Sequence, residues 1–191
     1  MLSINDLKNG SLVVIGGDPY IVMSVKHQHI GRGGSSIQTK IRNLKTGQTL
    51  ERNYKPSDEF EEAEMKKMKS RFLYENKGDC WFDEIGNPKN RFSLKKEEVG
   101  DSAGFLKPNL EVLAIIFDEK IINIELPIKI DYRVVEAPPA LRGDTAQGGV
   151  KTVTIETGAK ITAPLFINEG DIIRVNVQTG EYAERVEKIK S

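Results

Sequence analysis

The strongest constraint on the fold is a repeated pattern of short stretches that alternate apolar and polar residues, each bounded by turn residues. In residues 35–44, SSIQTKIRNL, Ile37 and Ile41 fall on one face of a strand, whereas Lys40 and Arg42 fall on the other. A period of two is typical of a strand with one buried face. Because the pattern recurs along the whole chain, it predicts an all-β protein.

Turn residues divide the strands into three successive modules, which we place at residues 1–64, 65–128 and 129–191. The first is predicted to be a small, strongly twisted antiparallel unit with a hairpin tip at residues 28–34. The second and third each have room for five short strands, enough for a small barrel of the oligonucleotide-binding (OB) kind. Since modules of this size bury only a modest core, we expect them to brace one another.

Three segments are less regular. DEFEEAE (58–64) suits either a linker or a strand with one exposed face, and MKKMKSRFLYEN (65–76) suits a helix by propensity but a strand by alternation, which we favour. A short helix is expected near KKEEVGDSAGFL (95–106). We assign Trp81 and Phe82 to the core of the second module.

Charge is unevenly distributed along the chain. Lys plus Arg and Asp plus Glu both number 28, so the net charge is zero. Residues 1–57, however, hold eight basic and three acidic residues, and the acidic run at 58–64 follows at once. This asymmetry predicts that one end of the molecule faces phosphate.

The remaining composition excludes several classes of protein. Cys80 is the single cysteine, so neither an internal disulfide nor a cysteine-based metal site is expected, as suits a reducing cytoplasm. The chain has no signal-like apolar core and no apolar run near the roughly 20 residues of a membrane span. We therefore expect a cytoplasmic protein with no membrane association.

Catalytic patterns are also missing from the sequence. We find no paired carboxylates with a pocket signature, no Ser-His-Asp arrangement and no phosphate-cradling loop, so we expect no catalytic residue and no enzyme. His27 and His29 fall on the same side of a strand, but without a third ligand nearby we expect no metal site. Polar surface contacts or stacking on RNA suit these histidines better.

The stretch HQHIGRGGSS (27–36) surrounds Arg32 with glycines, which let a backbone turn tightly or approach another molecule closely. A guanidinium is always charged, planar and forked, so it can pair with phosphate and stack on a base. The plainer alternative is an ordinary solvated loop arginine. The predicted tip loop around Arg32 comprises His29, Ile30, Gly31, Gly33 and Gly34.

Five stretches together resemble the bacterial elongation factor P family, in the right order and spacing. They are HIGRGG (29–34), KIRNLKTGQTLERNYK (40–55), LRGDT (141–145), KTVTIETGAKITAPLFINEGD (151–171) and TGEYAERV (179–186). The resemblance covers essentially the whole chain, and the long motif of the third module is its most specific part. With arginine at its tip, the chain resembles the arginine-tip members of this family.

The resemblance implies a fold and a function. The fold would be an L-shaped, tRNA-like arrangement of an N-terminal SH3-like barrel of the KOW type and two OB-fold barrels. The chain would bind the ribosome between the peptidyl and exit sites and stimulate peptide-bond formation at polyproline stalls by positioning peptidyl-tRNA. Its partners would be both ribosomal subunits, peptidyl-tRNA, rRNA and mRNA at the exit-site codon, and we expect a monomer.

The resemblance also implies a role for Arg32 at the peptidyl-transferase centre, near the acceptor end of peptidyl-tRNA. Many relatives have Pro-Gly-Lys-Gly at this tip and extend the lysine, whereas this chain has Ile30-Gly31-Arg32-Gly33. Arginine excludes the lysine modifications and leaves rhamnosylation of Arg32 open as a post-translational change. We favour an unmodified tip and expect no cofactor.

Two further groups of residues are predicted to contact RNA. For the first group, contact with tRNA or rRNA phosphates competes with an ordinary wet strand face. In the second group, the resemblance places the Gly-Asp-Thr loop near the anticodon end of the tRNA. Stacking of Tyr182 and Arg185 on RNA is one interpretation. An equally good one is that Tyr182 closes the barrel and Arg185 pairs with Glu181 or Glu184. The first group is Lys40, Arg42, Lys45 and Arg52; the second is Arg142, Gly143, Asp144, Thr145, Tyr182 and Arg185.

Two other functions stay open from the sequence. One is the elongation-factor-P-like paralogue, which also carries arginine at its tip and has a related ribosomal role. The other is a generic OB-fold RNA-binding protein, which would need exposed aromatic side chains along a strand face. Aromatic residues make up only 7% of the chain, which argues against the second.

Overall fold

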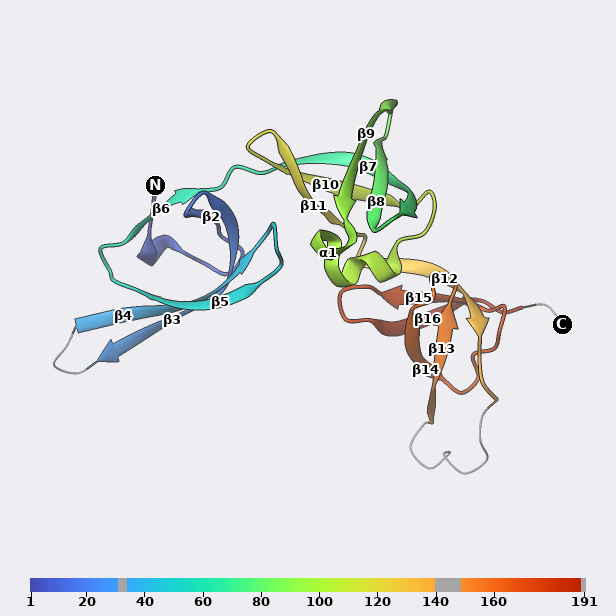
Figure 1. Cartoon of the computed structure of the whole chain (residues 1–191). Coiled ribbons are helices and arrows are strands. Elements are labelled where there is room, and N and C mark those ends of the chain that lie inside the picture. The colour runs from blue at the N-terminus through green and yellow to red at the C-terminus, as the bar shows by residue number, and fades with distance from the viewer. Residues whose placement is uncertain (31–33, 140–148, 190–191) are drawn as a thin grey trace. The chain divides into compact units, whose positions relative to one another are not determined.

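A computed structural model describes residues 1–30, 34–139 and 149–189, with the backbone alone at 27–30 and 34–35. The described chain consists of three antiparallel sheets, with a single α-helix, α1 (Lys96–Val99), which runs on into a 3-10 turn at Gly100–Phe105 (Figure 1). The predicted all-β class is confirmed. Within the described ranges, no helix is long and apolar enough to cross a membrane.

The first sheet has six strands in the order β1-β6-β2-β3-β4-β5. Its inner face carries the expected apolar positions: Ile37 and Ile41 are almost fully buried, together with Val13 and Val22. Phe60 is the buried residue of the acidic run, so that run is a strand with one exposed face. The strands are β1 (Leu2–Ser3), β2 (Leu12–Ile15), β3 (Asp18–Ile30), β4 (Gly34–Asn43), β5 (Thr49–Tyr54) and β6 (Glu59–Glu62).

The β3–β4 hairpin is the longest paired element of this sheet. Its register runs from Tyr20 opposite Asn43 to Ile30 opposite Gly34, with a bulge between Val22 and Ser24. The predicted tip loop of residues 28–34 was therefore too wide, because strand pairing continues through Gln28–Ser36, His29–Ser35 and Ile30–Gly34. Polar and glycine residues extend a hairpin when the opposite strand supplies hydrogen-bonding partners, and side-chain type alone does not reveal this.

The second sheet has five strands in the order β11-β10-β7-β8-β9. Residues 65–76 form a strand, as favoured, because Ser70 and Phe72 face the core while their neighbours do not. The short helix near residues 95–106 is also confirmed. The strands are β7 (Lys66–Asn76), β8 (Asp79–Glu84), β9 (Asn87–Lys95), β10 (Glu111–Phe117) and β11 (Lys120–Glu125).

Trp81 does not belong to the core of this sheet, contrary to the sequence prediction. Phe82 is fully buried, packing against Phe72 and Phe92 with ring centroids 5.5 and 5.2 Å away. Successive side chains of a strand point to opposite faces, so Trp81 has to lie on the outer face, where it is only half-buried.

The third sheet also has five strands, in the order β14-β13-β12-β15-β16. Val153 and Ile155 are fully buried, which confirms the period of two expected for residues 151–156. Tyr132, at the centre of the sheet, is the largest fully buried side chain. The strands are β12 (Lys129–Glu136), β13 (Val150–Ile155), β14 (Lys160–Pro164), β15 (Ile172–Asn176) and β16 (Glu181–Glu187).

Contacts divide the chain into two compact units, residues 1–68 with 113–124 and residues 69–112 with 125–191. The three sheets follow one another along the chain, and the module boundaries at 64/65 and 128/129 remain a prediction. The expected bracing between modules is found inside the second unit. There Tyr132 donates a hydrogen bond from its hydroxyl to the Phe105 carbonyl at 2.5 Å.

Lys107 strengthens the same junction of the second unit. Its Nζ donates to the Asp131 carbonyl at 2.6 Å and to the Glu156 carboxylate at 3.1 Å, and lies 5.1 Å from the centre of the Tyr132 ring. Burial raises the pKa of the Tyr132 hydroxyl, with the Glu156 charge adding to the effect, so this tyrosine stays neutral and keeps the O–H that donates to Phe105.

Candidate nucleic-acid interface

The predicted tip lies at the end of the β3–β4 hairpin. Because the strands pair as far as Ile30 and Gly34, only residues 31–33 connect them. Arg32, with Gly31 and Gly33, lies outside the described residues, and of His29, Ile30 and Gly34 the structure describes the backbone alone. The role of Arg32 therefore stays a prediction, while the hairpin that carries it is described.

Lys40 and Arg42 lie on the outer face of β4, as their spacing predicts. The residues between and beside them, Thr39 and Ile41, are buried, so the two cationic side chains point to solvent together. The Arg42 Nε donates to the Gly47 carbonyl at 3.2 Å, which holds its guanidinium against the 44–47 turn. The two cations are placed to attract phosphate in concert.

Lys26 joins this face, although its place in the sequence did not mark it as a contact residue. It is exposed and lies opposite Gln38, the residue two positions before Lys40 on the same face. Glu51 lies opposite Lys40 on β5, so the outer face of β3–β5 carries three cations and one carboxylate. The pairing register was the missing signal, because alternation within one strand does not show which residues of its neighbour share a face.

Lys45 is used within the fold. Its Nζ donates to the Asp18 carboxylate at 2.6 Å and lies 5.9 Å from the Phe117 ring centre. The hydrogen bond from Lys45 lowers the pKa of Asp18, with a further contribution from Asn43. This ion pair leaves Lys45 less available to an external phosphate than Lys40 or Arg42.

Arg52 lies on the opposite face of the sheet from Lys40 and Arg42. It pairs with Thr39, whose hydroxyl donates to the Arg52 carbonyl at 3.2 Å, and it shares its side of β5 with Leu50 and Tyr54. Burial raises the pKa of Tyr54, and the nearby Arg52 guanidinium opposes this rise. The four cations predicted from the sequence to contact phosphate therefore do not form one group in the structure: Lys40 and Arg42 share a face, whereas Lys45 and Arg52 do not join them. Their phosphate-contact role stays a prediction.

The Gly-Asp-Thr loop of the third sheet, Arg142 to Thr145, lies outside the described residues. The ends that flank it are described. Lys151 Nζ donates to the Pro138 carbonyl at 2.9 Å, and Thr154 donates to the Glu136 carboxylate at 3.1 Å. These bonds tie the end of β12 and the segment that follows it to β13, so they join the two chain segments that flank the predicted RNA-contact loop.

Tyr182 and Arg185 lie on β16, opposite Val175 and Ile173, which are both fully buried. A bulge in the register brings these two side chains, three positions apart, to the same side of the sheet. The alternative pairing of Arg185 with Glu181 or Glu184 is not the one observed. Its Nη1 instead lies 3.5 Å from the Asp171 carboxylate.

Phe166 is the partner of Arg185 that sequence reasoning missed. The Arg185 guanidinium lies 5.0 Å from the centre of the Phe166 ring, and that ring is 54% exposed. An exposed ring with a fixed guanidinium over it can stack on an RNA base. Phe166 lies within LFINEGD, so the motif was in view, but its contact with β16 depends on tertiary packing.

Asp171 organises the end of the third sheet. It is fully buried and accepts hydrogen bonds from the backbone N–H groups of Asn168 and Ile189 at 3.0 and 2.9 Å. Burial works to raise the pKa of Asp171, but these bonds and the charge of Arg185 outweigh it, so the pKa is lowered. The carboxylate therefore stays ionised. Its hydrogen bonds link the segment after β16 to the turn before β15.

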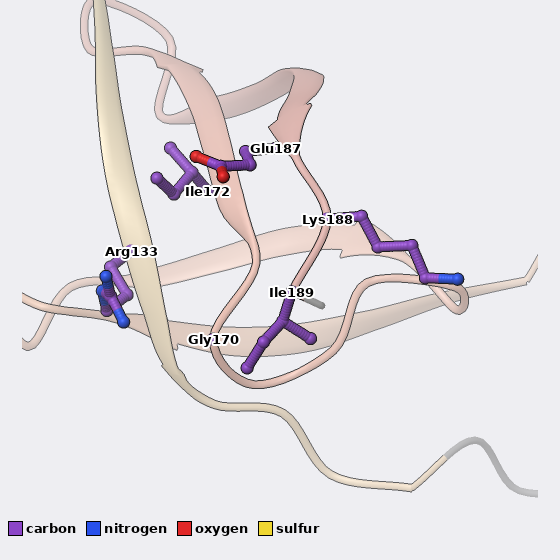
Figure 2. Close-up of a pocket in the computed structure, with 6 residues that line it drawn as sticks. All are labelled: Arg133, Gly170, Ile172, Glu187, Lys188 and Ile189. Atoms are coloured by element: carbon purple, nitrogen blue, oxygen red, sulfur yellow. The ribbon is translucent and has the colours of Figure 1, made fainter. Parts of the chain in front are cut away.

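A shallow pocket lies beside this turn (Figure 2). Its lining combines residues of β12, the turn before β15, β15, the end of β16 and the segment after it, and Figure 2 shows Ile189 lying beside Gly170. A Cβ at Gly170 would lie 2.3 Å from the Ile189 Cδ1, and the Gly170 φ of +89° also favours glycine. The lining residues are Arg133, Gly170, Ile172, Glu187, Lys188 and Ile189.

Within the part of the chain that the structure describes, no three His, Cys, Asp or Glu side chains are grouped to hold a metal ion. The pocket residues bring together no nucleophile with a base. What the arrangement offers chemically is positive charge on the outer strand faces and the exposed ring of Phe166 in the turn after β14, which suits binding to a phosphate backbone.

Comparisons with known proteins agree with this description. The model of the elongation factor P KOW-like domain matches residues 3–60, and that of the elongation factor P C-terminal domain matches residues 130–185. Elongation factor P of Moorella thermoacetica is 36% identical, and that of Thermotoga petrophila 38% identical, each over 97% of this chain and 100% of the relative.

The chain belongs to the elongation factor P family, a family of translation factors. Among solved structures, a eukaryotic translation initiation factor 5A from Methanococcus jannaschii superposes with a TM-score of 0.51. The two are 16% identical, and the match covers 66% of this chain and 90% of that one, so it supports the fold alone.

Proposed function

We propose that this chain binds the ribosome between the peptidyl and exit sites and stimulates peptide-bond formation at polyproline stalls. It does so by positioning peptidyl-tRNA and without bond chemistry of its own. The partners are the two ribosomal subunits, peptidyl-tRNA and rRNA, with the 141–145 loop near mRNA at the exit-site codon. Membership of the elongation factor P family over the full length supports the proposal.

The β3–β4 hairpin is the single structural observation that carries the proposal. It pairs through ten residue positions and carries Arg32 between its last paired residues. A paired hairpin holds its end more rigidly than a loop of the same length, and a rigid element positions a charged group at little entropic cost. Lys26, Lys40 and Arg42 follow the same hairpin, where they would hold the phosphates of the acceptor arm.

The direct test is Arg32→Ala in a reconstituted translation system with a template that encodes consecutive prolines. We expect the variant to lose the stimulation of proline–proline bond formation. The thermal unfolding midpoint should remain unchanged, because the buried core of the first sheet is built from other residues. Full stimulation by Arg32→Ala would contradict the assigned role of the tip.

Arg32→Lys is the matched control, since it keeps the charge but removes the planar fork. Partial activity would separate the need for charge from the need for a guanidinium. A template without consecutive prolines should respond to none of the variants. Intact-mass measurement of protein from its native cell tests the modification, because a deoxyhexose adduct on Arg32 would replace our expectation of an unmodified tip.

A further inference from the structure

The outer face of β7, β8 and β9 carries an aromatic pair that the proposed function does not use. Tyr74 and Trp81 lie opposite one another on β7 and β8, with ring centroids 6.3 Å apart and ring planes 24° from parallel. Tyr74 is 47% exposed. A bulge between Phe72 and Tyr74 shifts the register and brings the two rings together.

A cationic row lies next to this aromatic pair. Arg71, Asp83 and Arg91 face one another across the three strands, one pair of residues further along the sheet. Rows on one face of a sheet are separated by about 7 Å. The two arginines therefore leave the sheet one row away from the rings, a spacing comparable to the size of a nucleotide.

Asp83 fixes one arginine of this row, Arg71. Although it is on the outer face, it is only 2% exposed, and Arg71 reaches it with two hydrogen bonds of 3.2 and 2.6 Å. The hydrogen bond from Arg71 lowers the pKa of Asp83, and the nearby charge of Arg91 lowers it further. One buried carboxylate thus orients a guanidinium that is still 39% exposed.

The charge of this face favours an anionic partner. Lys69 and Lys95 extend the row of cations on β7 and β9, giving four cations against the carboxylates of Asp79 and Asp83. A third carboxylate, Glu111 on β10, lies near Arg71 and leaves the surplus positive. A surplus of positive charge around a stacked pair of rings, one exposed and one half-buried, matches a single-stranded nucleic acid, whose bases stack and whose phosphates carry the charge.

We propose that the outer face of β7–β9 binds unpaired RNA, with a base stacked on the Tyr74–Trp81 pair and a phosphate held by Arg91. This site is separate from the hairpin tip and does not depend on the role of Arg32. The low aromatic content of the chain argued against RNA binding by exposed aromatic side chains along a strand face. The Tyr74–Trp81 pair supplies such side chains on the middle sheet.

The chain supplies its own probe for this site, because Trp81 is its only tryptophan. We expect a single-stranded RNA of about twelve nucleotides to quench Trp81 fluorescence saturably when it is titrated into the full chain without ribosomes. Quenching should weaken as salt rises, since phosphate contacts release counterions. No quenching at RNA concentrations up to about 1 mM would overturn the proposal.

Matched variants separate this site from general charge attraction. Tyr74→Ala should weaken RNA binding about tenfold, whereas Tyr74→Phe should retain it, because the ring and not the hydroxyl stacks. Arg91→Gln should weaken binding and flatten its salt dependence, while Lys96→Gln, which removes a cation already paired with Glu75, should do neither. Equal loss in Tyr74→Ala and Tyr74→Phe, or in Arg91→Gln and Lys96→Gln, would contradict the assignment.

A protein partner is the competing outcome. If ribosomal proteins freed of RNA quench Trp81 and RNA does not, the face binds protein and our proposal is wrong. Because none of these titrations involves translation, they are independent of the Arg32 test. A chain with an inactive tip would still quench, and a chain without this site would still rescue stalled synthesis.

Discussion

The cations of the first and third sheets are the same residue types put to different uses. On the outer face of the first sheet, Lys26, Lys40 and Arg42 form no ion pair within the described residues. In the third sheet, Arg174 binds Asp131 at 2.6 Å and Glu184 at 2.7 Å. The charge of Lys26, Lys40 and Arg42 is thus available to a partner, whereas the charge of Arg174 holds strands together.

The comparison shows why a count of basic residues is a poor guide to an RNA interface. The field of a cation with a nearby carboxylate is largely cancelled within the fold, so a neighbouring phosphate feels little of it. Lys45 illustrates this within the first sheet, because its bond to Asp18 makes it resemble Arg174 more than Lys40. Three groups of variants test the division between free and paired charge.

The largest effect is expected where a paired charge is buried. Asp171→Ala removes the acceptor of two backbone N–H groups and the partner of Arg185. Breaking such a buried arrangement by removing one partner costs on the order of 3 kcal/mol. Urea unfolding should show this decrease in stability. An unchanged midpoint would contradict the claim that paired charge stabilises the third sheet.

The pH dependence gives an independent check of Asp171. Its pKa in the folded chain is lowered from the ordinary value of 3.8, so its stabilising effect is present above that value and is lost as the pH falls through the folded pKa. Asp171→Asn should therefore make unfolding less dependent on pH in the acid range. If the free energy of unfolding of Asp171→Asn depended on acid pH as it does in the parent chain, other carboxylates would be responsible for that dependence.

The intermediate effect concerns the free charges. Lys40→Gln combined with Arg42→Gln should weaken ribosome binding about tenfold and lower the salt slope by about two, because each substitution removes one cation that pairs with phosphate. Neutral substitutions are preferable to reversals, because a glutamate at position 40 would face Glu51. Stability should stay within about 0.5 kcal/mol, as for surface substitutions generally.

Glu51→Gln is the opposite control for the same face. It removes the one carboxylate opposite Lys40, so ribosome binding should tighten and not weaken. Binding measured by sedimentation at several salt concentrations distinguishes the two directions. Weaker binding by Glu51→Gln would show that the face acts through packing and not through charge.

The smallest effect is expected at Lys45. Lys45→Met keeps most of the side-chain volume but breaks the pair with Asp18, in which both side chains are about two-fifths exposed. Exposed pairs contribute less than about 1 kcal/mol, so the decrease in stability should be small. Ribosome binding should change less than in the Lys40 and Arg42 variant, and an equal change would return Lys45 to the set of contact residues.

Much of the fold follows from local pattern. Residues 35–44 alternate as half-buried strands do, and burial of Ile37, Thr39 and Ile41 confirms the face assignment. Residues 58–64 and 65–76 were ambiguous because acidic residues and good helix formers carry weak strand propensity. Phe60 and Phe72 are buried in these two segments, and both segments pair as strands with their neighbours.

The sites were less predictable than the strands. The RNA-contact role of Arg185 stays a prediction, and its ring partner Phe166 is nineteen positions away along the chain. Trp81 was placed in the core because large aromatic residues usually are buried. A register bulge on β7 instead set Tyr74 beside it on the outer face, which no pattern within either strand indicates.

The sequence by itself determined the all-β class, the order of the strands along the chain, the family, and the excess of positive charge in the first third. These are local or cumulative properties, and they can be counted along the chain. Only the tertiary structure decided which cations stay free, that Lys45 and Arg52 leave the face of Lys40, and that Tyr74 meets Trp81. Those outcomes depend on which residues of separate strands come to lie opposite one another, and that register is fixed by the packing of whole sheets.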